Sequence, residues 1–318
     1  MLLFTRRAAL LAALIFTSSA SGPAAALSLM DPFNVPGTMD GGVTTLGQDI
    51  VYGPLDRHKL DIYAPENSLE KSAPVIIFLY GGAWKQGTKA DYPFAGHALA
   101  ARGFVTVIPD YRLVPEVQYP EFLSDNAVAV KWVEDNISRY GGDPQRVYLM
   151  GHSAGAYNAV MLGMDRSYLR DAGVTIPIRG VVGLAGPYAV YPFEFKELQD
   201  AFGNVDNPQM TQPINLPTVE TVPMFLGHGS NDLIVNVENT IRMQKKLLTD
   251  SRAVEAKVYD SLGHMEVVTA LSTVWRWRSP VLEDVVGFLK AEGAFDPESF
   301  GPLDLVDAVT PVVEAKVN

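Results

Sequence analysis

The sequence contains no cysteine and few histidines. Its 318 residues include no Cys and only five His. The absence of cysteine excludes disulfide bonds, zinc–cysteine sites and a cysteine nucleophile. It also excludes a bacterial lipoprotein anchor, because that modification needs a cysteine. A histidine base, if the chain uses one, has few candidates.

Clustered positive charge is also lacking. The chain has 25 Lys and Arg against 36 Asp and Glu, a formal net charge of -11, and no cationic stripe that could follow a phosphate backbone. Electrostatics therefore argues against a nucleic-acid partner. Hydrophobic residues make up 47% of the chain and charged residues 19%, a composition typical of globular proteins with a substantial core. We expect one large domain.

The N-terminus has the pattern of an export signal. Arg6 and Arg7 form a positive region, residues 8–16 are apolar, and residues 24–26 are alanines that provide a small-residue cleavage site. We therefore expect residues 1–26 to be removed and the protein to be exported, either periplasmic or secreted. The apolar segment is too short to span a bilayer comfortably, so no stable membrane anchor is expected after signal removal.

Short apolar runs alternate with helical patterns between residues 48 and 293. Eight runs predict strands, at 49–52, 59–63, 75–80, 104–109, 147–150, 178–184, 222–227 and 255–259. The first two predict an antiparallel hairpin, whereas the later runs are nearly continuously apolar, as in parallel strands buried on both faces. Helices are predicted over 91–102, 121–140, 154–164, 237–249 and 280–291. This alternation predicts an α/β fold with a mainly parallel eight-stranded sheet flanked by helices.

Three segments fall outside this alternation. Residues 186–221 are rich in proline and aromatic residues without clear periodicity, which predicts an irregular cap or pocket wall. Residues 27–47 are expected to form an N-terminal extension, and residues 294–318 an acidic C-terminal tail.

A candidate nucleophile lies directly after the predicted strand 147–150. Gly151-His152-Ser153-Ala154-Gly155 has the G-x-S-x-G pattern, in which the glycines allow a sharp strand-to-helix turn that projects the serine hydroxyl above the sheet edge. The same turn directs the N–H of Ala154 toward a reacting oxygen. The pattern occurs by chance in many proteins, so its weight depends on the other catalytic groups.

A serine hydroxyl needs a base to remove its proton. His264 follows the last predicted strand, where a loop can return over the carboxyl edge of the sheet, and Asp232 follows the preceding strand. The chain order Ser153, Asp232, His264 is the order of the nucleophile-elbow hydrolases. Asp260 is the alternative acid. It is less favoured because it lies only four residues before His264.

A glycine-containing loop follows the predicted strand 75–80. In Tyr80-Gly81-Gly82-Ala83-Trp84 the two glycines allow the backbone to approach a bound ester and to present N–H groups to its developing oxyanion.

Four ordered segments match one known pattern. Residues 80–84 are similar to a His-Gly-Gly-x-Trp loop, residues 110–116 to D-Y-R-L-x-P-E, residues 140–155 to paired G-G-D-P and G-H-S-A-G motifs, and residues 228–232 with 263–264 to acid and base loops. The region from about residue 48 to 292 therefore resembles the α/β-hydrolase superfamily. Within it, the chain resembles the carboxylesterase group of hormone-sensitive-lipase-like and kynurenine formamidase-like hydrolases. The resemblance implies an α/β-hydrolase fold and oxyanion donors at the amides of Gly82, Ala83 and Ala154. Tyr80 departs from the pattern, since this group commonly has a histidine there that helps to hold the oxyanion loop.

These assignments predict a serine carboxylesterase that hydrolyses small-molecule esters, of small to medium apolar character, through an acyl-enzyme intermediate. It would use no metal or organic cofactor. Ser153 attacks, His264 is the general base and then the general acid, and Asp232 orients the imidazole. The rate should rise through about pH 6 to 7, because the base must be neutral. Trp84 and Tyr188 are candidates for the substrate-pocket wall, with core packing as the alternative.

Other functions remain open. The same machinery would serve a formamidase-type amide hydrolase or a polysaccharide acetyl esterase. A hydrolase fold can also act as a non-catalytic binding protein, although such a protein has no chemical need of all three side chains. The sequence does not predict the oligomeric state.

Overall fold

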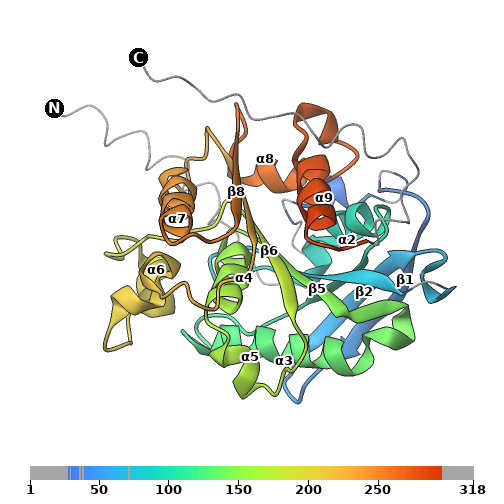
Figure 1. Cartoon of the computed structure of the whole chain (residues 1–318), viewed down its shortest axis with the longest axis horizontal. Coiled ribbons are helices and arrows are strands. Elements are labelled where there is room, and N and C mark those ends of the chain that lie inside the picture. The colour runs from blue at the N-terminus through green and yellow to red at the C-terminus, as the bar shows by residue number, and fades with distance from the viewer. Residues whose placement is uncertain (1–27, 29, 36, 38, 71, 296–318) are drawn as a thin grey trace, which may run out of the picture.

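The computed structural model describes residues 28, 30–35, 37, 39–70 and 72–295. One sheet of eight strands runs through this part of the chain (Figure 1), in the spatial order β1-β2-β4-β3-β5-β6-β7-β8. The strands are β1 (Val43–Val51), β2 (Lys59–Pro65), β3 (Ala73–Leu79), β4 (Val105–Pro109), β5 (Gly142–His152), β6 (Ile178–Leu184), β7 (Met224–Gly229) and β8 (Val254–Tyr259). The predicted mainly parallel eight-stranded sheet is therefore confirmed.

Strand β2 alone runs against the others. It pairs antiparallel with β1 on one side and with β4 on the other, while every pair from β4 to β8 is parallel. The strands β3 and β4 are buried along their whole length, which explains their continuous apolar sequence. The predicted hairpin of β1 and β2 forms at the sheet edge, and residues 52–58 connect its strands.

Helices cover both faces of the sheet. Helices α2 and α9 lie on one side, and α3, α4, α5 and α7 lie on the other (Figure 1). Their bounds, with those of two short helices near the site, are α2 (Pro93–Ala100), α3 (Glu121–Asn136), α4 (Ala154–Met164), α5 (Ser167–Asp171), α6 (Lys196–Phe202), α7 (Glu238–Thr249), α8 (His264–Thr269) and α9 (Val281–Ala291). Every residue of α4 is buried, because this helix packs against the centre of the sheet. The five predicted helices are present.

The segment between β6 and β7 contains more structure than its sequence suggested. It includes helix α6 and two 3-10 turns, at residues 208–211 and 213–215. Ala201 and Phe202 of α6 are buried, and the carbonyl of Ala201 accepts a hydrogen bond from the amide of Tyr119 at 2.9 Å. This segment is therefore joined to the loop that precedes α3.

The N-terminal extension packs on the domain. Strand β1 begins at Val43, five residues before the predicted domain boundary at 48, and the side chains of Met30 and Phe33 are buried in the core. Arg276 binds both carboxylate oxygens of Asp40 at 2.8 Å, which joins the extension to the segment before α9. The predicted signal at residues 1–26 and most of the tail, residues 296–318, lie outside the described residues, and export stays a prediction. Within the described part, no helix is both long and apolar enough to cross a membrane.

Candidate active site

The predicted site residues come from loops at the carboxyl edge of the sheet. Ser153 follows β5, and the segment that we call the oxyanion loop, residues 81–87, follows β3. Asp232 follows β7, and His264 is the first residue of α8, beyond β8. Because these four strands are parallel, their loops emerge at the same edge. Residues that are 111 positions apart in the chain, Ser153 and His264, are brought into contact there.

The turn at Ser153 is a strained one that needs glycine on both sides. Ser153 has φ 54° and ψ −120°, a conformation that non-glycine residues rarely adopt. A Cβ atom on Gly151 would lie 2.2 Å from the carbonyl oxygen of Gly155, and one on Gly155 would lie 2.0 Å from that of Leu79. Only glycine therefore allows α4 to start this close to the end of β3, and the tight turn presents the serine hydroxyl.

Ser153, His264 and Asp232 form a continuous hydrogen-bonded series. The Oγ atom of Ser153 lies 2.9 Å from Nε2 of His264, and Nδ1 of His264 lies 2.7 Å from Oδ2 of Asp232. An ionised carboxylate can only accept, so the proton of the neutral imidazole is on Nδ1. The lone pair on Nε2 then faces the serine hydroxyl, as a general base requires.

Asp232 is fixed by three further contacts. Its Oδ1 accepts hydrogen bonds from the amides of Ile234 and Val235 at 2.9 and 2.8 Å, and its Oδ2 lies 3.1 Å from Nε2 of the buried His228. Burial raises the pKa of this carboxyl, but hydrogen bonds from His228 and His264 outweigh it and bring the pKa well below its usual range. Asp232 is thus a carboxylate throughout the neutral range. Sequence reasoning missed His228, although its spacing of four residues from Asp232 was a usable signal.

Asp260, the alternative acid, is exposed and makes no hydrogen bond to His264 in the described structure. The contact of Asp232 with the imidazole distinguishes the two candidates. Within the described ranges, no group of three or more His, Asp or Glu side chains is arranged to hold a metal ion.

His152, which precedes the candidate nucleophile, connects two loops of the site. Its Nε2 donates to the carbonyl oxygen of His264 at 3.0 Å, which leaves Nδ1 to accept from the hydroxyl of Tyr92 at 3.4 Å. The same hydroxyl accepts a long hydrogen bond, 3.4 Å, from the amide of Gly81. Burial, with repulsion from His264, lowers the pKa of His152 to about 3. The G-x-S-x-G pattern assigns no role to His152, which occupies its variable position, whereas the structure gives this residue polar contacts to both loops.

The amides assigned to the oxyanion hole are free to bind a ligand. Among the described residues, the N–H groups of Gly82, Ala83 and Ala154 have no hydrogen-bond partner. Ala154 is the first residue of α4, so its amide also carries part of the positive end of the helix dipole. A Cβ on Gly81 would lie 3.0 Å from the Cβ of Ser153, which shows how closely the oxyanion loop approaches the nucleophile. The arrangement suits a negatively charged oxygen beside Ser153.

Trp84 and Tyr188 do not line an open pocket, and their assignment to a pocket wall is corrected. Tyr188 has no exposed surface and Trp84 is 2% exposed. The indole N–H of Trp84 donates to Oδ1 of Asn158 at 2.9 Å, and its ring packs edge-on against Tyr157 and Phe202. The Trp84 ring therefore packs in the core behind the oxyanion loop, and Tyr188 is a core residue as well.

Comparison with known proteins assigns the chain to a family. The family model BD-FAE matches residues 60–247, which is more than half of the chain. The chain belongs to the BD-FAE family. The matched region contains Ser153 and Asp232 and ends before His264.

Two of the curated relatives are named as methylesterases. The chain is 27% identical, over 77% of its length, to isoprenylcysteine alpha-carbonyl methylesterase ICME of Arabidopsis thaliana, of which it covers 62%. It is 39% identical, over 75% of its length, to probable isoprenylcysteine alpha-carbonyl methylesterase ICMEL1 of Oryza sativa subsp. japonica, of which it covers 61%. The chain thus spans less than two thirds of the length of either relative.

Solved structures show the same fold. An inhibited esterase B from Lactobacillus rhamnosis superposes with a TM-score of 0.70 at 17% identity, covering 83% of this chain and 91% of that one. The resemblance to the α/β-hydrolase carboxylesterases and the predicted α/β-hydrolase fold are thereby confirmed.

Proposed function

We propose that this BD-FAE family member is a serine carboxylesterase that works through an acyl-enzyme intermediate. The observation that carries the proposal is the series from Ser153 through His264 to Asp232, with heavy-atom distances of 2.9 and 2.7 Å. Nucleophile and base are within hydrogen-bond reach, and the base is oriented by a third group, as nucleophilic catalysis requires.

The reaction follows from these positions. Nε2 of His264 takes the proton of the Ser153 hydroxyl as Oγ attacks the ester carbonyl, and the carbonyl oxygen becomes the oxyanion. The amides of Gly82, Ala83 and Ala154 stabilise that charge. The imidazolium, stabilised by the Asp232 carboxylate, then protonates the leaving alcohol. Water repeats the sequence on the acyl-enzyme, which releases the acid and restores the serine.

Both relatives described above are named for hydrolysis of a carboxylic ester, and this supports an ester as the substrate of this chain. Their names specify a methylesterase, so a substrate panel should contain methyl esters beside aryl esters of increasing acyl length. We propose small to medium apolar esters as the preferred class.

The test is hydrolysis of a p-nitrophenyl ester series by the wild type and by Ser153→Ala. We expect Ser153→Ala to lose essentially all turnover. The control is Ser138, an exposed serine just before the start of β5, whereas Ser153 follows its end. Turnover of Ser138→Ala should be unchanged. A p-nitrophenyl phosphonate should label the wild type once, on the peptide that contains Ser153. Turnover in Ser153→Ala equal to that of Ser138→Ala would refute the proposal. A matched aryl formamide distinguishes ester from amide hydrolysis.

A further inference from the structure

The backbone of the oxyanion loop adopts dihedral angles that some of its own residues disfavour. Four of its residues, Gly82, Ala83, Trp84 and Gly87, have φ between 52° and 130°. For the two that are not glycine, such a conformation costs on the order of 1 to 3 kcal/mol each. Inside the loop, the carbonyl of Gly82 accepts from the amides of Lys85 and Gln86 at 3.0 and 3.1 Å. The ends of the loop therefore have to be held by other parts of the chain.

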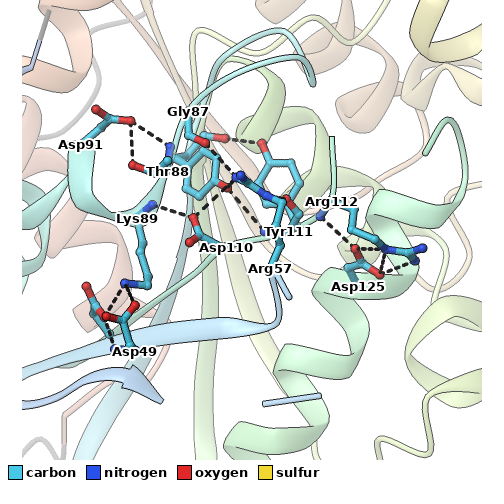
Figure 2. A network of polar contacts seen from close by, with 12 residues as sticks. Asp49, Arg57, Gly87, Thr88, Lys89, Asp91, Asp110, Tyr111, Arg112 and Asp125 are labelled. Carbon is cyan, nitrogen blue, oxygen red and sulfur yellow. Dashed lines mark hydrogen bonds and ion pairs between the residues drawn. The ribbon is translucent and has the colours of Figure 1, made fainter. Parts of the chain in front are cut away.

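Arg57 contacts both ends of this loop. Its Nη2 donates to the hydroxyl of Tyr80 at 2.8 Å, directly before the loop, and to the carbonyl oxygen of Gly87 at 2.9 Å, the last loop residue. Its Nε donates to the carbonyl oxygen of Tyr111 at 2.7 Å. Figure 2 shows the guanidinium between Gly87, Asp110 and Tyr111. One side chain thus joins the two ends of the loop to the segment after β4.

Tyr80 transmits this contact to the start of the loop. Its ring is fully buried and stacks on Tyr111, with ring centroids 4.7 Å apart. Its carbonyl oxygen accepts a hydrogen bond from the Tyr111 hydroxyl at 2.8 Å. The Tyr80 hydroxyl also accepts a long hydrogen bond, 3.4 Å, from the amide of Tyr111. Tyr80 replaces the histidine of the related loops, and its longer side chain reaches the guanidinium.

A second set of contacts fixes the segment after the loop. The amide of Lys89 donates to Asp110 at 2.8 Å, and its ammonium, almost fully buried, lies 2.7 Å from Asp49 and 2.9 Å from Asp61 (Figure 2). Asp49 belongs to β1 and Asp61 to β2. Arg57 lies in the turn between the same two strands. The edge hairpin therefore supports the oxyanion loop in two ways. Arg57 contacts the loop directly, and the two aspartates hold Lys89, which follows the loop.

We propose that Arg57 is a positioning residue that sets the oxyanion hole by holding Tyr80 and Gly87 at a fixed separation. The inference rests on the proposed function, because it concerns the same reaction. Arg57 contacts no reacting atom and acts through the loop. Its loss lets the loop relax from its unfavourable backbone conformation, and the amides of Gly82 and Ala83 then move away from the position of the oxyanion.

The test compares Arg57 with an arginine of similar bonding elsewhere. Arg146 lies in β5, toward the end of the strand that is remote from Ser153. It binds Asp143 at 2.7 Å and donates to the carbonyl oxygen of Ala294 at 3.0 Å and to the carbonyl oxygen of Ser72. The two side chains are 29% and 20% exposed, so Arg146→Ala is a matched control for lost hydrogen bonds. The readouts are kcat and KM for one p-nitrophenyl ester, the rate of phosphonate labelling of Ser153, and the urea midpoint.

We expect Arg57→Ala to lower kcat by about tenfold to a hundredfold with KM within about threefold, because the amides act mainly in the transition state. Phosphonate labelling should slow in parallel, since the phosphoryl oxygen occupies the same hole. Arg57→Lys should recover little, because an ammonium cannot reproduce the planar fork. Arg146→Ala should lower the urea midpoint and leave kcat within about twofold.

Two conservative variants, Arg57→Lys and Tyr80→Phe, guard against loss of folding. Tyr80→Phe removes a single hydroxyl and keeps the stacked ring, and we expect its kcat to fall by about tenfold. If folded Arg57→Lys and Tyr80→Phe both match the kcat of Arg146→Ala, the inference is wrong while the esterase assignment stands. If the wild type hydrolyses no ester, or Ser153→Ala keeps full turnover, the proposed function fails and this inference fails with it.

Discussion

Replacing His152 by glutamine should make folding stability less sensitive to acid. His152 is buried behind the nucleophile turn, and burial, with repulsion from His264, lowers the pKa of its imidazole from 6.5 to about 3. The unfolded chain binds a proton at this residue below about pH 6.5, whereas the folded chain does so only near pH 3. Between these values the unfolded state holds more protons, so the free energy of unfolding falls as the pH falls.

The size of the effect follows from the shift. Each pH unit below 6.5 removes about 1.4 kcal/mol, so about 3 kcal/mol is lost between neutral pH and about pH 4.5. Glutamine does not titrate, and its amide can still donate to the carbonyl oxygen of His264. We therefore expect His152→Gln to lose about 3 kcal/mol less than the wild type over this interval.

Urea unfolding followed by tryptophan fluorescence, at about pH 7 and about pH 4.5, measures both losses. The comparison is the difference between the two pH values within each protein, so any loss of packing in the variant at neutral pH cancels. Equal acid sensitivity of His152→Gln and the wild type would show that His152 is not held neutral by burial, and the reasoning would be refuted.

Three other substitutions test separate parts of the site. Asp232→Asn should lower kcat by about 10³ to 10⁴ with little change in the circular dichroism spectrum, because an amide that donates to Nδ1 selects the wrong imidazole tautomer; a kcat within tenfold of wild type would contradict this. Gly82→Ala places a Cβ 2.1 Å from the carbonyl oxygen of Gln86 at a residue with φ 130°, so ester turnover should fall by about 10² or more. Asn158→Leu leaves the buried indole N–H of Trp84 without an acceptor and should destabilise the fold by about 1 to 3 kcal/mol in urea titrations, and unchanged stability would indicate that the hydrogen bond contributes nothing.

Local sequence pattern was sufficient for the sheet and its parallel core. Buried parallel strands are apolar on both faces, so segments such as residues 75–79 are recognisable without a partner. Ser153, Asp232 and His264 were also recognisable, since each follows a strand and parallel strands share one carboxyl edge. The contacts among the three support the roles assigned to them, which stay proposals until the variants are measured.

The residues that sequence reasoning missed depend on contacts between distant segments. Arg57 reaches Gly87, 30 residues away, and no periodicity in either segment indicates this. The contacts of His152 could not be read from the motif because its partners, Tyr92 and the backbone of His264, belong to other segments. The assignment of Trp84 and Tyr188 to a pocket wall was wrong for the same reason. An aromatic side chain such as Trp84 looks identical in sequence whether it faces a substrate or a layer of other rings.

The edge hairpin makes the chemistry of the middle of the chain dependent on its beginning. A segment from residue 73 to residue 269 would contain the candidate nucleophile, acid, base and all three amides, yet it would leave behind Arg57 and both aspartates that bind Lys89. A protein built from that segment alone would keep every reacting group and would lack Arg57, the side chain that keeps the amides in place. The family match, which starts at residue 60, does not include Arg57 either.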